Sequence, residues 1–280
     1  MSIRLGIRAH DMKADSITEL FSKIKADKFL DIQLAPRRLQ KNGLEISIAN
    51  PGAANYLKKR LTHYDLSIAI LGCYINMIHP DPAIREQELQ YFEAGITASK
   101  WLNNCVIATE TGSLSTAGYT EQNFTATAFN QMVTSVQRLT TFAEKVGAII
   151  AVEPGVNHPL YDADMVAKLL KAVPSPCLKL VFDPVNLMTL ENYKEQRAII
   201  SDFMARFSNK IVSFHLKDFI VQNNTISTVA FGQGQLAHEF YLELIDQNNP
   251  HTFATLEGIQ EVQIPAAITA VKHTVNLDSY

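Results

Sequence analysis

Four residues of the kinds that bind divalent metal ions each follow a short apolar segment. Glu153 follows AIIAV, Asp183 follows LKLVF, His215 follows IVSF and Glu257 follows FATL. Short apolar runs are typical of buried strands, and barrel enzymes place their chemistry where parallel strands end. Three carboxylates and one imidazole suit a hard or borderline cation. The pattern therefore predicts a site for one divalent ion, namely Mn²⁺, Mg²⁺, Co²⁺ or Zn²⁺.

The positions two residues before these candidates point the same way along each strand. They hold small or modest side chains that leave room for a cation, namely Ala151, Val181, Ser213 and Thr255. Without a cation, three converging carboxylates would raise one another's pKa values. A single acidic residue after a strand is more often a helix cap or a surface charge. The joint pattern on four consecutive strands favours the metal site over that simpler interpretation.

The elements that must position these residues are alternating strands and helices. Apolar runs predict eight strands, at Ile3–Arg8, Phe29–Leu34, Leu66–Cys73, Asn104–Thr109, Ala148–Glu153, Leu178–Asp183, Ile211–Leu216 and Phe253–Glu257. Near-continuous apolar runs indicate strands buried on both faces of a parallel sheet. The chain of 280 residues is close to the roughly 250 typical of an eight-stranded α/β barrel. We therefore expect a single (β/α)₈ TIM barrel, forming one domain over residues 1–280.

Helical segments are expected between the strands. Asp81-Pro82 provides an N-cap followed by proline at the first helical position, and Asp162 precedes another amphipathic run. One apolar stripe at helical spacing consists of Ile84, Leu89, Phe92 and Ile96. No glycine-rich fingerprint follows the first strand, which argues against a dinucleotide-binding sheet. Two connections, Thr111 to Gln122 and Lys217 to Gln235, are longer than a barrel needs and are expected on the catalytic face.

Composition limits the class of protein. A net charge of −3 and a pI near 6.2 give no electrostatic signature of binding to nucleic acid or to a membrane surface. The cysteines Cys73, Cys105 and Cys177 are odd in number and form no CxxC pair, as in reduced intracellular proteins. No signal-peptide core is present, and no apolar run approaches the roughly 18 residues of a membrane span. A cytoplasmic location is expected.

Short motifs surround or lie between several of the candidate metal ligands, namely FDPVN around Asp183, FHLKD around His215, FGQGQL at Phe231–Leu236 and TLEG at Glu257. Together with Glu153 at a strand end, they resemble the xylose isomerase-like barrel superfamily of sugar-phosphate isomerases and epimerases. The resemblance runs over most of the chain and is sharpest from Ala148 to Gly258. It implies the same barrel, and that Glu153, Asp183, His215 and Glu257 coordinate one divalent metal.

In the epimerase branch of this superfamily, two glutamates also form the acid/base pair. The resemblance implies that Glu153 and Glu257 do so here, acting on opposite faces of the substrate carbon. The substrate would be a small carbohydrate, a ketose or ketose phosphate, converted through a metal-stabilised enediolate. Which of the two glutamates removes the proton is left open by the sequence.

Further residues near the expected strand ends are candidates for substrate binding. They are Glu110, His158, Asn186, Lys217, Asp218, Gly232 and Gly234. Gln33, Asn76 and His79 also lie near expected strand ends and are secondary candidates for binding substrate hydroxyl groups. An ordinary turn explains the GxG sequence about as well as contact with a phosphate does. Lys217 and Asp218 either contact the substrate or form an ion pair with each other at the barrel rim.

Departures from the superfamily pattern narrow the function. Asn186 occupies a position that is often histidine, and Glu110 stands where endonuclease IV relatives have a metal-binding histidine. Both argue against the three-zinc site of those DNA-repair enzymes.

Alternative functions remain open. The same site would serve a metal-dependent dehydratase of a sugar or cyclitol, and a barrel without catalysis would serve as a sugar-binding protein. No pair of arginines for clamping a phosphate stands out on the expected catalytic face, so free sugars and sugar phosphates are both retained. Relatives often dimerise or tetramerise, and the sequence leaves open whether this chain forms a homo-oligomer.

Overall fold

Eight parallel strands close into a barrel at the centre of the molecule. The computed structural model describes residues 2–278. The strands lie in the order β10-β7-β6-β5-β4-β3-β2-β1, and β1 also pairs with β10, which closes the ring. The predicted (β/α)₈ TIM barrel is confirmed. Its strands are β1 (Ser2–Arg8), β2 (Asp31–Leu34), β3 (Ser67–Gly72), β4 (Val106–Glu110), β5 (Ile150–Glu153), β6 (Leu178–Phe182), β7 (Ile211–Leu216) and β10 (Phe253–Leu256).

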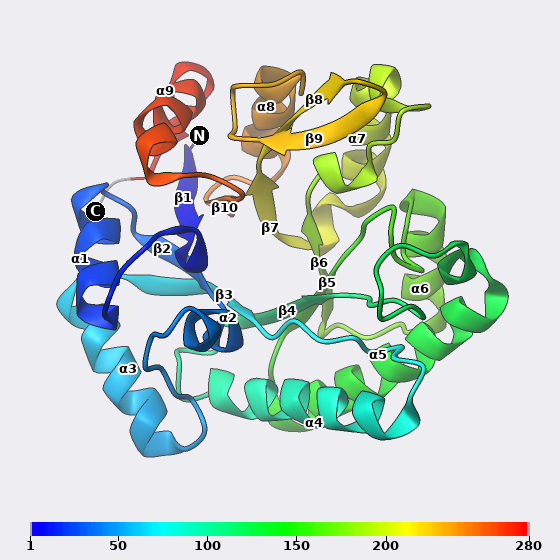
Figure 1. Ribbon diagram of the computed structural model, residues 1–280, viewed down its shortest axis with the longest axis horizontal. Helices are drawn as coiled ribbons and strands as arrows, with labels where there is room; N and C mark the ends of the chain where they lie inside the picture. The colour runs from blue at the N-terminus through cyan, green and yellow to red at the C-terminus, as the bar shows by residue number, and fades with distance from the viewer. Residues whose placement is uncertain (1, 279–280) are drawn as a thin grey trace.

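Helices surround the strands on the outside of the barrel (Figure 1). Asp81 caps one of them by accepting a hydrogen bond from the backbone N–H of Ala83 at 2.8 Å, and Asp162 accepts from Met165 at 2.8 Å. Both predicted caps are confirmed. The α-helices are α1 (Ile17–Ala26), α2 (Pro36–Lys41), α3 (Pro51–His63), α4 (Pro82–Ser99), α5 (Ala126–Val146), α6 (Ala163–Ala172), α7 (Gln196–Phe207), α8 (His238–Asn248) and α9 (Ile264–Thr274).

Apolar side chains fill two layers. The larger layer lies between the strands and the helices, and the smaller layer, inside the barrel, contains Ile70, Ala108, Ala151 and Val181. Three members of the predicted α4 stripe are buried in the larger layer, but Ile84 is 41 % exposed. The helix predicted from this spacing is confirmed, and Ile84 lies in its first turn, at the surface of the molecule.

Several strands begin later than their apolar runs predict. Before β2, Lys28 has a φ of 64°, and before β4, Asn103 and Asn104 have φ values of 61° and 53°. Before β5, the N–H of Ala148 still donates to Ala143 in the last turn of α5. These residues end the preceding helix or its turn, so the strand ladder starts after them.

The two long connections differ from each other. Residues 111–125 include a short 3₁₀ helix at Glu121–Phe124, whereas the segment after β7 forms a hairpin of β8 (Asp218–Gln222) and β9 (Thr225–Val229). This hairpin lies outside the barrel ring (Figure 1). The short strand β11 (Asn276–Leu277) pairs with β1. Among residues 2–278, no helix is both long and apolar enough to cross a membrane.

Candidate metal centre

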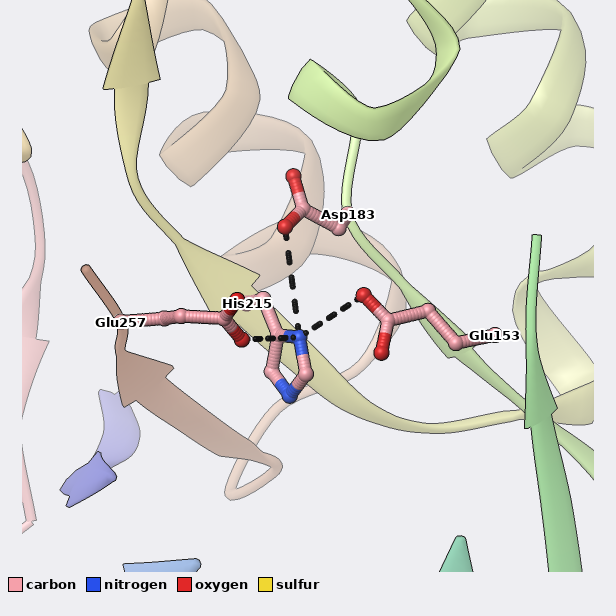
Figure 2. A group of neighbouring side chains, drawn as sticks. All are labelled: Glu153, Asp183, His215 and Glu257. Carbon is pink, nitrogen blue, oxygen red and sulfur yellow. Dashed lines mark hydrogen bonds and ion pairs between the residues drawn. The ribbon is translucent and has the colours of Figure 1, made fainter. Parts of the chain in front are cut away.

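The four ligand-type side chains converge at one end of the barrel. His215 Nδ1 lies 3.0 Å from Glu153 Oε1, 2.9 Å from Glu257 Oε2 and 4.0 Å from Asp183 Oδ2. Figure 2 shows the three carboxylates arranged around this nitrogen. One ligand atom from each residue lies within 4.8 Å of those of the others. This group of oxygen and nitrogen atoms fits a single divalent cation.

Successive strands supply these side chains from their carboxyl ends. Glu153 is the last residue of β5, Asp183 and Glu257 directly follow β6 and β10, and His215 lies near the end of β7. The layer predicted beneath them is fully buried and consists of Ala151, Val181, Ser213 and Thr255. Asp183 is also fixed by the backbone N–H of Val185, which donates to its Oδ1 at 2.9 Å. The interior of the barrel beneath the site is therefore packed, and the ligand side chains lie on the carboxyl-terminal side of this layer.

The second nitrogen of His215 is held by a glutamine. His215 Nε2 lies 2.7 Å from Gln33 Oε1, an atom that only accepts, so Nε2 carries a hydrogen and donates it. The amide nitrogen of Gln33 in turn donates to the hydroxyl oxygen of Tyr74 at 2.6 Å. This chain leaves His215 Nδ1 as the nitrogen that can bind a metal. Metal-binding histidines are commonly oriented in this way through their other nitrogen.

Two cations stand beside the carboxylates. Lys217 Nζ lies 2.7 Å from Asp183 Oδ2 and 3.4 Å from Glu257 Oε1, and it donates to Asn186 Oδ1 at 2.7 Å. Arg8 Nη1 lies 2.6 Å from Glu257 Oε1. The guanidinium of Arg8 is itself held by Asp11, with Nε donating to Oδ1 at 2.9 Å. Glu257 thus turns Oε2 toward His215 and Oε1 toward the cations.

Burial and charge shift the pKa values of these groups in different directions. Burial raises the pKa of Asp183 to about 6, although nearby Lys217 opposes this shift. Burial lowers the pKa of His215, but the charges of Glu153 and Glu257 outweigh it and raise that pKa well above its ordinary value. Burial also raises the pKa of Glu257, but Lys217 and His215 hold it well below the usual range. Without a cation, the proton on His215 therefore balances part of the negative charge, and a divalent ion would replace it.

Three further predicted residues lie at the rim near this centre. Glu110 stands in register with Glu153 on the neighbouring strand and keeps 49 % of its side chain exposed. His158 Nδ1 lies 2.8 Å from the carbonyl oxygen of Gly112, and its Nε2 lies 3.9 Å from Glu110. Asn186 donates to Glu153 Oε1 at 2.7 Å. Together with Lys217, these side chains border the cluster.

Asp218, Gly232 and Gly234 have other partners. The fully buried carboxylate of Asp218 accepts backbone N–H groups from Phe219, Gly234 and Leu236 at 2.8 to 2.9 Å. A side chain at position 234 would place Cβ only 2.3 Å from Asp218 Oδ1, and one at position 232 would meet Ala270 on α9. Asp218 does not pair with Lys217. Asp218 and Gly234 thus hold the loop after β9, and the N–H of Gly234 is already used. Contact of these three residues with substrate stays a prediction.

Arg8 and Tyr74 are parts of the centre that were not predicted from the sequence, whereas Gln33 was predicted only as a partner for a substrate hydroxyl group. Arg8 is the last residue of β1, and Gln33 is the residue before the last of β2. The rule that identified the four ligands, a metal-binding side chain at a strand end, does not select Arg8; a wider rule that accepts any polar side chain at a strand end would have done so. Tyr74 follows β3 by two residues, and nothing in its sequence context distinguishes it.

Comparison with known proteins assigns the family. A model of the xylose isomerase-like TIM barrel matches residues 21–273. The chain belongs to this family. Resemblance predicted this assignment, and the match confirms it. The comparison with curated proteins found no match.

Several solved structures share the fold at low sequence identity. A D-tagatose 3-epimerase-like protein has a TM-score of 0.76 at 14% identity, with 97% of each chain covered. The probable 3-DHS dehydratase AsbF, involved in petrobactin synthesis in Bacillus anthracis, has a TM-score of 0.71 at 16% identity and covers 99% of this chain and 100% of its own. IOLI protein with a binding zinc atom has a TM-score of 0.72 at 15% identity, covering 97% and 96%.

Proposed function

We propose that the chain is a divalent-metal-dependent isomerase or epimerase that acts on a ketose or a ketose phosphate. The observation that carries this proposal is the placement of two glutamates. Glu153 and Glu257 approach His215 Nδ1 from opposite sides, at 3.0 and 2.9 Å (Figure 2). Two carboxylates facing each other across one position are suited to removing a proton from one face of a carbon and returning it at the other. The neighbour described as D-tagatose 3-epimerase-like supports this class of reaction.

The donor atoms fit Mn²⁺, Mg²⁺, Co²⁺ or Zn²⁺, and Glu153, Asp183, His215 and Glu257 would hold the ion. Bound there, a divalent ion would supply a Lewis acid for the negative charge that develops on substrate oxygens. The solved neighbour with bound zinc supports the presence of a metal.

The side chains of this protein divide the proton transfers between two oriented carboxylates. Asn186 fixes Oε1 of Glu153, while Arg8 and Lys217 fix Oε1 of Glu257. One glutamate removes the proton bound to carbon, and the other supplies a proton to the opposite face or to the neighbouring carbon. General acid–base assistance of this kind contributes on the order of 10²–10⁴-fold to the rate. Replacing either glutamate by glutamine should therefore lower turnover by about that factor.

Substrate hydroxyl groups would be bound at the rim of the centre. Glu110, His158 and Asn186 lie there, and Lys217 reaches between the carboxylates. Each offers a donor or an acceptor to a polyhydroxylated substrate, as expected for a carbohydrate site.

Solvent exchange tests this function. The protein would first be analysed for metal by elemental mass spectrometry and then incubated in D₂O with a panel of ketoses and ketose phosphates. The expected result is deuterium in the sugar by NMR without loss of water, and its absence in Glu153→Gln and Glu257→Gln. An unsaturated product would instead establish dehydration, the reaction named for the Bacillus anthracis neighbour. Sugar binding with no exchange in any substrate would establish a binding protein and overturn the proposal.

A further inference from the structure

A pocket with a cationic lining lies beside the metal centre, at the ends of β2 and β3. Its volume is about 180 Å³, enough for a phosphate or carboxylate group together with water. None of the residues that line it is acidic. The lining consists of Ala35, Arg37, Arg38, Lys41, Gly72 and Tyr74.

Hydrogen bonds join this pocket to the metal centre. Tyr74 in the pocket wall accepts from Gln33, and Gln33 accepts from the metal-site His215. The pocket is therefore separated from His215 by one amide group and two hydrogen bonds.

The metal centre is open on the same side of the barrel. Arg8 and Glu257 keep 21 % and 12 % of their side chains exposed, whereas Asp183 and His215 keep 0 % and 1 %. Arg8 lies on β1, which pairs with β2 and so adjoins the strands that carry the pocket. The partly exposed edge of the centre at Arg8 therefore adjoins the strand that leads into the pocket.

The cationic side chains of the pocket differ in whether they already have a carboxylate partner. Arg37 is already paired with Glu88 at 2.8 Å and stacks on Tyr91, whose ring centre is 3.3 Å from the guanidinium carbon. Within residues 2–278, Arg38 and Lys41 have no carboxylate at ion-pair distance, and the guanidinium of Arg38 lies 5.7 Å from the ring centre of Tyr74. Burial raises the pKa of Tyr74, so its hydroxyl keeps its proton and, since it accepts from Gln33, can donate that proton elsewhere.

We infer that Arg38, Lys41 and Tyr74 bind an anionic group, a phosphate or a carboxylate, at the end of the substrate remote from the reacting carbons. Two cations and one hydroxyl donor match the several acceptor oxygens of such a group. This inference rests on the proposed function and narrows its substrate class to anionic sugars.

Titration with inorganic phosphate tests the pocket without a choice of sugar. Calorimetry would compare the metal-loaded wild type with Arg38→Gln, Lys41→Gln and the double variant. Each single change should weaken phosphate binding by about tenfold, because each removes a charge-assisted hydrogen bond. The matched control is Lys59→Gln plus Arg197→Gln, which removes two exposed cations on α3 and α7 and should change nothing. The series would be repeated in an Asp183→Asn background, which lacks one metal ligand. Phosphate bound to the metal then no longer contributes to the measured affinity.

Equal phosphate affinity in wild type and double variant overturns the inference. Malonate, titrated in parallel, separates the two chemical sources, since the tighter of the two probes identifies the preferred anion. The proposed function fails independently. If neutral ketoses exchange deuterium and the double variant binds phosphate as tightly as the wild type, the anion site is contradicted but the proposed function is not. Phosphate binding that depends on Arg38 and Lys41, without deuterium exchange into any sugar, would contradict the proposed isomerase function but not the anion site.

Discussion

At the scale of single residues, protons and a metal ion compete for the same atoms. His215 Nδ1 lies within hydrogen-bonding distance of two carboxylates, and burial raises the pKa of Asp183 to about 6. The pKa of His215 is raised well above its ordinary value by Glu153 and Glu257. A metal must therefore displace the proton of His215 at neutral pH, and that of Asp183 at lower pH.

Metal affinity should consequently fall as the pH is lowered. Below pH 6 Asp183 gains a proton in the metal-free protein. Metal binding must then release this proton in addition to the proton on His215. We expect the apparent affinity for Zn²⁺ or Mn²⁺ to fall more steeply below pH 6 than above it. Competition with a chelating dye between pH 5 and pH 8 measures this. A pH-independent affinity would contradict the proton assignments.

Gln33 should influence metal affinity although it is not a ligand. Replacing it by methionine removes the acceptor that holds His215 Nε2–H, so the ring loses its preferred tautomer and orientation. Changes of this kind weaken metal binding by about 10–100-fold. The control Gln90→Met alters an exposed side chain on α4 and should have no effect. Equal affinities in the two variants, with both proteins folded by circular dichroism, would exclude this positioning role.

At the scale of elements, one buried carboxylate organises the segment that follows β7. Asp218 begins β8 and binds three backbone N–H groups, two of them in the loop after β9. Asp218→Ala should lower the free energy of unfolding by about 3 kcal/mol, since it leaves buried donors unsatisfied. Asp218→Asn retains one acceptor oxygen and should lose less. Urea unfolding followed by circular dichroism compares the two, and a loss below about 0.5 kcal/mol in the alanine variant would contradict this account.

The elements themselves were largely predictable from the sequence, with informative exceptions. All eight barrel strands are short apolar runs that the sequence predicts, but the hairpin of β8 and β9 lies where the sequence predicts a loop. Its second strand, TISTV, is mostly exposed and lacks the apolar signal of the barrel strands. The signal that was present is the pair Asn223-Asn224, whose φ values of 51° and 57° form the tight turn typical of a two-residue hairpin. Positive φ at Lys28, Asn103 and Asn104 likewise explains the strands that start late.

At the scale of the whole molecule, the ligands were predictable but their surroundings were not. Glu153, Asp183, His215 and Glu257 obey a local rule, one ligand type per strand end. Tyr74 and Arg8 belong to the site only because the closed ring brings β3 and β1 to the same rim as β7 and β10. The sequence also gave no sign of the cationic pocket, since Arg38 and Lys41 lie on α2, a short helix that was not predicted.

Metal binding should stabilise the entire fold because its ligands come from four of the eight barrel strands. A ligand present at a hundred times its dissociation constant adds about 2.7 kcal/mol to the free energy of unfolding. Chemical unfolding with and without the bound ion should show this difference. In Asp183→Asn the difference should be much smaller. Equal stability of the metal-loaded and chelator-treated wild type would indicate that the ion does not bridge these strands.

The ring itself is completed by strands from distant parts of the chain. Arg4 to Ile7 of β1 pair with Phe253 to Leu256 of β10, so this seam joins the first strand of the barrel to its last. Contacts of such high sequence separation form slowly during folding. Until β10 docks, β1 and β7 each present an open edge that can pair with another chain. The charged side chains of Arg4 and Arg8 on β1 would then disfavour pairing of this edge with another chain. Once β10 has docked, Arg8 forms an ion pair with Glu257 instead.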